Sequence, residues 1–314
     1  MGKLAFVFPG QGAQAVGMGK DAFEASSAAR ALFSKADEVL GYRLSDIIFN
    51  GPEEQLKLTY HTQPALLTVS VALLGWLDDA GVRPDYVAGH SLGEYSALVA
   101  AGVISFEDAV RAVRLRGEFM DRAVPSGKGA MAAVLGAERE ALEALCRQLT
   151  DDTDTIELAN VNCPGQIVVS GSKIGVDGIV ARGKEAGAKR VIPLEVSGPF
   201  HSSLMKPAAA QLAEVLQQLT LRPAEVPVVA NVTAAPVTDA ELIRSLLVQQ
   251  VYSPVLWEDS VTRMIDEGVD TFVEIGSGAV LSGLIKKIDR TVTCHTLNSV
   301  SSIEKFVEEV SQHA

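Results

Sequence analysis

The stretch GHSLGEYSALVAAG, residues 89–102, places one serine between two glycines directly after a short apolar run. Gly89, Ser91 and Gly93 have the spacing G-x-S-x-G, which is typical of a nucleophile elbow, a sharp turn between a strand and a helix. The glycines let strand and helix approach closely, because side chains there would collide. The turn lifts the Ser91 hydroxyl out of the packing and aims the helix N-terminus at it. We predict a catalytic serine; the alternative is a tight turn that carries an exposed serine.

The composition argues against several classes of function. The chain has 314 residues and a formal net charge of −12, which disfavours non-specific binding to nucleic acids or acidic membranes. Its three cysteines lie far apart and show no metal or disulfide spacing. The longest apolar run, residues 64–77, is shorter than the ~18 residues that predict a membrane span. Because residues 1–10 also lack the pattern of a signal peptide, we expect a cytoplasmic protein without a metal site.

Strands and helices alternate along most of the chain, which predicts an α/β fold with a parallel sheet covered by helices. The expected elements include one helix at residues 23–40 and one strand at residues 226–232. Residues 126–198 differ, because their predicted order is βαββαβ, the order of a ferredoxin-like unit. We therefore expect an α/β core formed by residues 1–125 and 199–314, with a ferredoxin-like subdomain at residues 126–198.

Ser91 needs a base, because an alcohol is a weak nucleophile near neutral pH. The sequence holds five histidines. His90 adjoins the serine in a tight turn, so its side chain should diverge from the hydroxyl. His201 follows a predicted strand and precedes a helix, which places it at the C-terminal edge of a sheet, where α/β proteins form their sites. His201 is the candidate base; the alternative is a helix-capping or surface histidine.

Arg116 lies on the apolar face of a predicted amphipathic helix that begins after the N-cap residue Ser105. A buried guanidinium is costly unless an anionic group meets it. The partner is either a carboxylate of the chain itself or the carboxylate of a ligand, which arginine binds through two parallel hydrogen bonds.

Two further positions are candidates from their place after strands. PGQGAQ, residues 9–14, nearly matches a dinucleotide fingerprint, but the proline and the lack of a following acidic strand end disfavour that function. The backbone amide of Gln11 could instead supply half of an oxyanion hole. Glu274 ends a predicted strand and is a candidate third member of a triad; the alternative is a capping or structural carboxylate.

Taken together, several segments resemble the malonyl-CoA:acyl carrier protein transacylase family. They occur in order across nearly the whole chain: FPGQGAQ, TQPALL, GHSLGEYSALVAAG, RLRGEFM, VNCPGQIVVSG, PFHSSLMKPA, VYSPVLW and EIGSGAVLSGL. The resemblance implies a hydrolase-like α/β core with a ferredoxin-like insert, the division reached above from the order of the elements.

The resemblance also implies residue roles. Ser91 would be the acylated nucleophile, His201 its base, and Arg116 the group that binds the malonyl carboxylate. The backbone amides of Gln11 and Leu92 would form the oxyanion hole.

Four weaker assignments follow from the same resemblance. A backbone carbonyl orients the histidine in this family, and Gln250 matches that position, which would explain the missing acid. Gln63 and Asn162 match polar residues near the pocket. Phe200 matches an aromatic residue that accompanies malonyl rather than branched acyl groups.

The implied reaction is a ping-pong transfer of malonyl from malonyl-CoA, through a malonyl-serine, to the phosphopantetheine thiol of acyl carrier protein in fatty-acid biosynthesis. The expected partners are malonyl-CoA, CoA and the carrier protein, with no cofactor, no nucleic acid and no membrane; the chain itself is expected to be a monomer. The alternatives are a malonyltransferase of polyketide assembly, a serine thioesterase or other hydrolase, and a catalytically silent interaction subunit.

An acidic chain needs a local positive patch to bind an acidic carrier protein. The sequence offers two candidates, which are Lys286, Lys287 and Arg290 in one cluster and Lys184, Lys189 and Arg190 in the other. The alternative is that these side chains are ordinary solvated charges.

Overall fold

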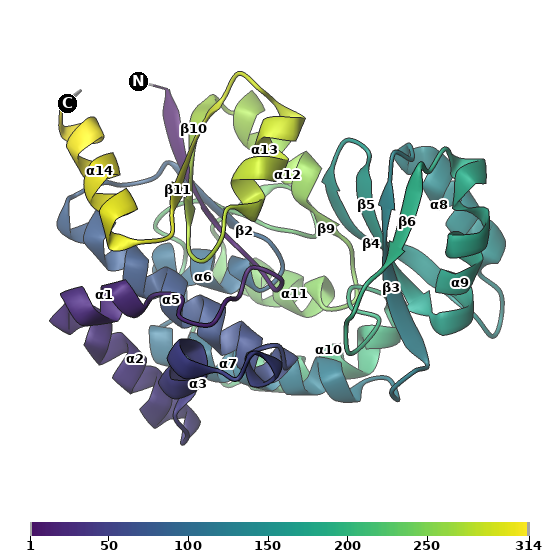
Figure 1. The fold of residues 1–314 in the computed structure, drawn as a ribbon, viewed down its shortest axis with the longest axis horizontal. Helices are drawn as coiled ribbons and strands as arrows, with labels where there is room; N and C mark the ends of the chain where they lie inside the picture. Colours follow the sequence, from purple (N-terminus) through teal and green to yellow (C-terminus); the bar gives the residue numbers. More distant parts are fainter. Residues whose placement is uncertain (1, 313–314) are drawn as a thin grey trace.

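The computed structural model describes residues 2–312 and has a mixed α/β architecture with two sheets and many helices (Figure 1). The larger sheet has the strand order β11-β10-β1-β2-β7-β8. Its strands pair in parallel except for β7 and β8, which are antiparallel. Its strands are β1 (Lys3–Phe8), β2 (Tyr86–Gly89), β7 (Val228–Val229), β8 (Pro236–Val237), β10 (Val269–Ile275) and β11 (Thr293–Leu297).

Helices cover both faces of this sheet (Figure 1). Those before the second sheet are α1 (Lys20–Ala25), α2 (Ser27–Leu40), α3 (Leu44–Asn50), α4 (Glu53–Leu56), α5 (Thr59–Asp79), α6 (Gly93–Ala100) and α7 (Phe106–Arg122). Those after it are η2 (Ser203–Met205), α10 (Lys206–Gln217), α11 (Ala240–Gln250), α12 (Trp257–Asp266), α13 (Val280–Ile288) and α14 (Val300–Ser311). Within residues 2–312, none of the helices combines the length and the apolar composition needed to cross a membrane.

The smaller sheet has the order β6-β3-β5-β4-β9 and lies to one side of the larger one (Figure 1). Along the chain its elements are β3 (Gly129–Leu135), α8 (Arg139–Leu149), β4 (Ile156–Cys163), β5 (Gln166–Ser172), α9 (Lys173–Arg182), η1 (Gly183–Ala186) and β6 (Arg190–Pro193). These four strands pair antiparallel where they are neighbours, whereas the later strand β9 (Val255–Leu256) joins β4 in parallel. The two sheets are thus tied together by the chain that follows α11.

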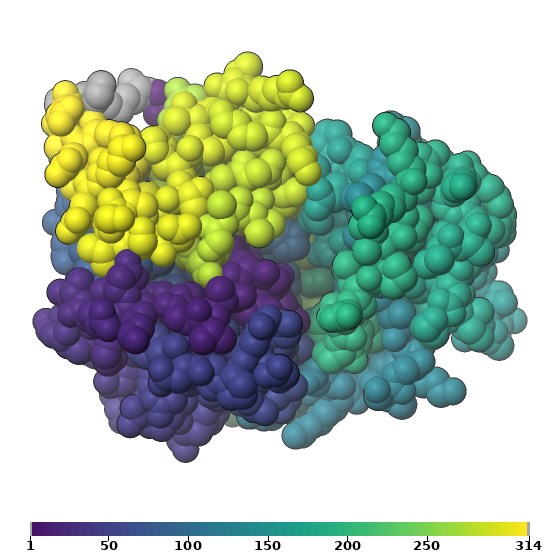
Figure 2. Space-filling view, viewed as in Figure 1, coloured from purple at the N-terminus to yellow at the C-terminus, as the bar shows by residue number. Residues whose placement is uncertain are grey.

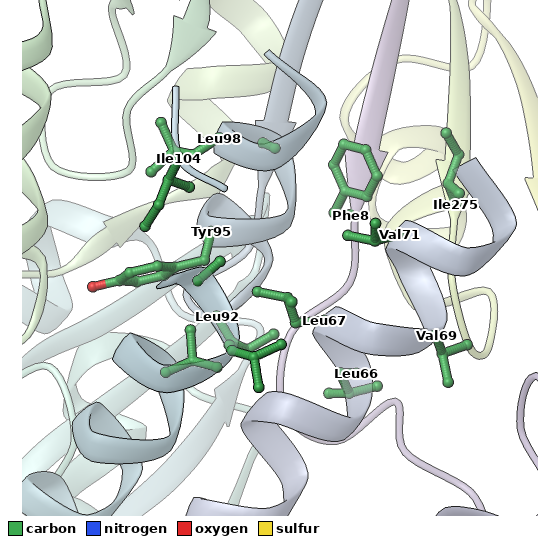
Figure 3. Close-up of a cluster of buried hydrophobic side chains, with 14 of the residues drawn as sticks. Phe8, Leu66, Leu67, Val69, Val71, Leu92, Tyr95, Leu98, Ile104 and Ile275 are labelled. Atoms are coloured by element: carbon green, nitrogen blue, oxygen red, sulfur yellow. The ribbon is translucent and has the colours of Figure 1, made fainter. Parts of the chain in front are cut away.

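The core between β1 and the helices is built from aliphatic and aromatic side chains. Figure 3 shows Leu66, Leu67 and Val71 of α5 packed among side chains from the strands and from α6. Phe8 and Tyr95 are both fully buried there. Burying such side chains is the main force that holds the strand ends and the start of α6 together.

Two predicted elements are wrong in extent. The helix predicted at residues 23–40 is broken at Ser26, whose extended backbone and hydroxyl cap α2 by accepting from the amides of Ala28 and Ala29. The strand predicted at residues 226–232 is only two residues long, because the backbone amide of Asn231 donates to the Glu94 carboxyl group instead of a neighbouring strand.

Candidate active site

The structure places a sharp turn at Ser91, between the end of β2 and the start of α6. Ser91 has a φ of 51°, in the left-handed region that non-glycine residues rarely adopt. A Cβ on Gly89 would collide with the backbone of Gly93, and a Cβ on Gly93 would collide with the backbone of Phe8. Glycine is therefore required at both positions, because strand, helix and β1 meet backbone to backbone.

Asn231 holds this turn from the other side and was not found from the sequence. Its Oδ1 accepts from the Ser91 amide at 2.8 Å, and its Nδ2 donates to the Gly89 carbonyl at 2.7 Å. One side chain thus stabilises the strained residue from both flanks. The signal in the sequence was a polar residue directly after the apolar run of β7, at the same sheet edge as Ser91.

Ser91 and His201 are brought together from distant parts of the chain. The distance from Ser91 Oγ to His201 Nε2 is 2.8 Å, and His201 Nδ1 lies 2.8 Å from the backbone oxygen of Gln250. Because a carbonyl only accepts, Nδ1 carries the proton and Nε2 is free to accept one from the serine. Burial, and secondly the positive charge of Arg116, lower the pKa of His201 to about 3, so the ring is a neutral base at pH 7.

The Arg116 guanidinium is 1% exposed and reaches the same hydroxyl. Nη2 donates to Ser91 Oγ at 3.1 Å and to Gln250 Oε1 at 3.0 Å, and Nη1 donates to Gln63 Oε1 at 2.7 Å. In the part of the chain that the structure describes, the buried Nε of Arg116 has no hydrogen-bond partner. Within residues 2–312, Arg116 forms no salt bridge with any carboxylate. Of the two partners considered from the sequence, a carboxylate of the chain itself is thus not in contact.

Ser91, His201 and Arg116 face one cavity of about 130 Å³. Its apolar wall includes Met131 and Phe200. Cavities for drug-sized ligands measure ~300–1,000 Å³, so this space suits a short acyl group.

Gln11 and Leu92 line the same cavity. Gly10 brings the first loop against the elbow, because a Cβ there would collide with the backbone oxygen of His90. Among the hydrogen bonds of residues 2–312, none involves the backbone N–H of Gln11 or of Leu92. Two unpaired amides beside the serine can bind an oxyanion.

Gln63 and Asn162, the two polar residues predicted near the pocket, line two different cavities. Gln63 lines the cavity and contacts Arg116, whereas Asn162 lies in an adjoining cavity of about 250 Å³ and its Oδ1 is 2.8 Å from His90 Nε2. Gln11 and Asn160 line both spaces. Asn162 is therefore near the approach to the serine rather than beside it.

Glu274 is not brought to His201. Its buried carboxylate accepts from the amides of Leu281 and Ser282 and from the Ser282 hydroxyl, at the start of α13. It is the capping carboxylate that the sequence left as an alternative.

A strained serine in contact with a neutral histidine, two unpaired amides and a buried cation define the site of a serine acyl-transfer enzyme. Comparison with protein families agrees: the model described as acyl transferase domain matches residues 5–309. The chain belongs to the acyl transferase family.

The chain is 53% identical over 312 residues to the malonyl CoA-acyl carrier protein transacylase of Bacillus subtilis, covering 99% of this chain and 98% of that protein. It is 50% identical over 308 residues to the protein of the same name from Staphylococcus aureus, covering 98% and 99%.

Solved structures are similar along the whole chain. The acyl carrier protein S-malonyltransferase of Vibrio cholerae has a TM-score of 0.94 at 45% identity, with 97% of this chain and 99% of that chain covered. A malonyl-transacylase solved in complex with a type II PKS acyl-carrier protein has a TM-score of 0.94 at 44% identity, with 98% and 99% covered.

Proposed function

We propose that this enzyme transfers the malonyl group of malonyl-CoA to the phosphopantetheine thiol of acyl carrier protein, in fatty-acid biosynthesis. One observation carries the proposal. The buried Arg116 guanidinium lies 3.1 Å from the Ser91 hydroxyl, and its hydrogen bonds within residues 2–312 all go to neutral oxygens. A cation in that position favours an acyl group that carries its own carboxylate.

The first half-reaction forms an ester on Ser91. The hydroxyl oxygen attacks the thioester carbonyl carbon while His201 Nε2 takes the hydroxyl proton. The amides of Gln11 and Leu92 bind the oxyanion, each contributing roughly 3–4 kcal/mol. The carbon–sulfur bond then breaks, and CoA leaves as the thiol with the proton held by His201.

The second half-reaction reverses these steps. His201 takes the proton of the phosphopantetheine thiol, and the sulfur attacks the malonyl ester. The ester bond to Ser91 breaks, and His201 returns the proton to the serine oxygen. The Gln250 carbonyl keeps the ring oriented throughout, which replaces the carboxylate of an ordinary triad.

The carboxylate of the bound acyl group would take the place of neutral oxygens on Arg116. Acetyl carries no carboxylate and would leave the guanidinium without an anionic partner, which a site of this kind rejects strongly. Phe200 and the other apolar wall residues would limit the size of the acyl group.

The cavity of about 250 Å³ that adjoins the site is the proposed route for the pantetheine arm. Residues of the first loop, of β5 and of α13 line it. Figure 2 shows the surface hollowed between the yellow-green C-terminal part and the teal insert.

We propose the two basic clusters as the surface for an acidic carrier protein, because one residue of each, Lys287 and Lys189, lies near residues beside this cavity. Lys287 Nζ donates to Gln166 Oε1 at 3.2 Å, and Gln166 lines the cavity. The side chain of Lys189 lies close to Gly136, whose amide donates to the carbonyl of Gly165 beside Gln166.

For the architecture we propose a hydrolase-like core of residues 1–125 and 199–314 and a ferredoxin-like subdomain of residues 126–198, in a monomer without a cofactor. The order β3, α8, β4, β5, α9, β6 and the antiparallel arrangement β6-β3-β5-β4 support the second unit.

Intact-mass analysis after incubation with malonyl-CoA tests the proposed function. The wild type should gain the mass of one malonyl group, and Ser91→Ala should gain none. Ser96→Ala is the matched control, because the Ser96 hydroxyl is buried in α6 and has no hydrogen-bond partner among the described residues, so its removal should leave labelling intact. Full labelling of Ser91→Ala would contradict the assignment, and rapid release of free malonate without carrier protein would favour a hydrolase.

A further inference from the structure

The acyl-transfer steps make no direct use of one buried carboxyl group, that of Glu94. It lies on α6, three positions after Ser91, and is 2% exposed. Its Oε2 accepts from the Asn231 amide at 3.1 Å and from Gln250 Nε2 at 2.8 Å. Among residues 2–312 it forms no salt bridge, although the charge of Arg116 acts on it. A buried carboxyl group is costly, so its position calls for a physical reason.

The reason lies in the side-chain amide of Gln250. Its Nε2 faces three oxygens, which are Glu94 Oε2 at 2.8 Å, Ser91 O at 2.9 Å and Asn231 Oδ1 at 3.1 Å. Its Oε1 therefore faces Arg116 Nη2 at 3.0 Å. Reversing the amide would set one oxygen against three others and a nitrogen against the guanidinium.

Gln250 thereby joins the two halves of the site. Its side-chain oxygen holds Arg116, and its backbone oxygen holds His201 Nδ1 at 2.8 Å. Of the three acceptors that orient its amide, Glu94 gives the shortest bond and is the one ionisable group.

We propose that Glu94 is a positioning residue for malonyl selectivity: by fixing the amide of Gln250, it keeps Arg116 and His201 aligned around Ser91. The inference rests on the proposed malonyl transfer. It distinguishes Glu94 from a buried carboxyl group that only stabilises the fold.

The test compares single-turnover loading of Ser91 from malonyl-CoA and from acetyl-CoA. Glu94→Ala should lower the ratio of the malonyl rate to the acetyl rate by about tenfold or more, a size typical of residues coupled in one network. Glu94→Gln keeps an acceptor oxygen and should restore most of the ratio. Glu94→Met, which keeps the volume without an acceptor, takes the place of Glu94→Ala if that variant does not fold.

A matched control removes a hydrogen-bonded carboxylate elsewhere. Asp37 accepts from the amide of Ser45 at 2.8 Å and from its hydroxyl, and it does not line the cavity. Asp37→Asn should lower thermal stability without changing the loading ratio.

A double-mutant cycle tests whether Glu94 acts through Gln250. Gln250→Ala removes the amide but keeps the backbone carbonyl, and it should reproduce the loss of selectivity. Adding Glu94→Ala to Gln250→Ala should lower the ratio little further.

Three results would overturn the inference: an unchanged ratio in Glu94→Ala or Glu94→Met, equal losses in Glu94→Ala and Glu94→Gln, or fully additive losses in the double variant. Failure of the proposed function looks different, because the wild type itself would then not load malonyl.

Discussion

Two buried charged groups in this enzyme, Glu274 and Arg116, differ in the partners that the fold gives them. Glu274 is fully buried and receives three hydrogen bonds from donors at the start of α13. Arg116 is as deeply buried, but in the described part of the chain its hydrogen bonds go to neutral oxygens of Gln63, Gln250 and Ser91, and its Nε has no hydrogen-bond partner there. The first charge is satisfied by the fold, and we propose that the second is left for the carboxylate of a ligand. Burial alone therefore does not mark a functional charge; the kind of partner does.

The largest expected effect comes from removing Arg116, whose charge has no carboxylate partner among residues 2–312. Arg116→Ala should lower kcat/KM for malonyl-CoA by roughly 30-fold to 5,000-fold, because a buried charge pair with the acyl carboxylate is lost. Its kcat/KM for acetyl-CoA should fall far less or rise. Steady-state kinetics with both thioesters checks this, and equal losses for the two substrates would remove Arg116 from selectivity.

Removing the charge of Glu274, which the fold already satisfies with hydrogen bonds, should lower stability and leave selectivity unchanged. Glu274→Gln turns one acceptor oxygen into a donor that faces donors at the start of α13, which should cost about 1–3 kcal/mol of the free energy of unfolding. Urea denaturation measures that loss. The ratio of malonyl to acetyl loading should stay at the wild-type value, and a changed ratio would show that the contrast with Arg116 is wrong.

The smallest effect concerns pH. The pKa of His201 is lowered to about 3, so the ring stays neutral as the pH falls from 7.5 to 5.5. An unperturbed histidine, with a pKa of ~6.5, would lose roughly tenfold in its neutral fraction over that interval. The rate of malonyl loading should therefore fall less than twofold over that interval. The measurement uses the Glu94→Gln variant, because burial raises the pKa of Glu94 to about 7 and its titration would otherwise overlap the interval. A tenfold loss there would contradict the neutral base.

The lowered pKa of His201 and the raised pKa of Glu94 make the stability of the fold depend on pH in opposite directions. The folded state keeps His201 unprotonated, so its contribution is present above pH ~6.5 and is lost as the pH falls toward 3. The folded state keeps Glu94 protonated, so its contribution is present below pH ~4.5 and is lost as the pH rises through about 7.

The sequence predicted the local features of the site well. The G-x-S-x-G spacing located the turn at Ser91, and helical periodicity located Arg116 on a buried face, since both depend on near neighbours in the chain. The order of strands and helices also predicted that the larger sheet is mainly parallel and is covered by helices.

The hydrogen-bond network that supports the site could not be predicted from near neighbours in the chain. Asn231, Glu94 and the Gln250 side chain meet only because β2, β7 and α11 converge at one sheet edge. The backbone amide of Asn231 donates to Glu94 rather than to a strand, which also explains why β7 is shorter than its apolar pattern predicted.

A crystal structure of the enzyme with malonyl esterified to Ser91 would show directly whether Arg116 binds the acyl carboxylate. We expect the malonyl carboxylate on Arg116, with an oxygen about 2.7–2.9 Å from each of Nη1 and Nη2 and with Gln63 displaced from the guanidinium. A carboxylate directed to solvent, with Arg116 still bound to both glutamines, would contradict it.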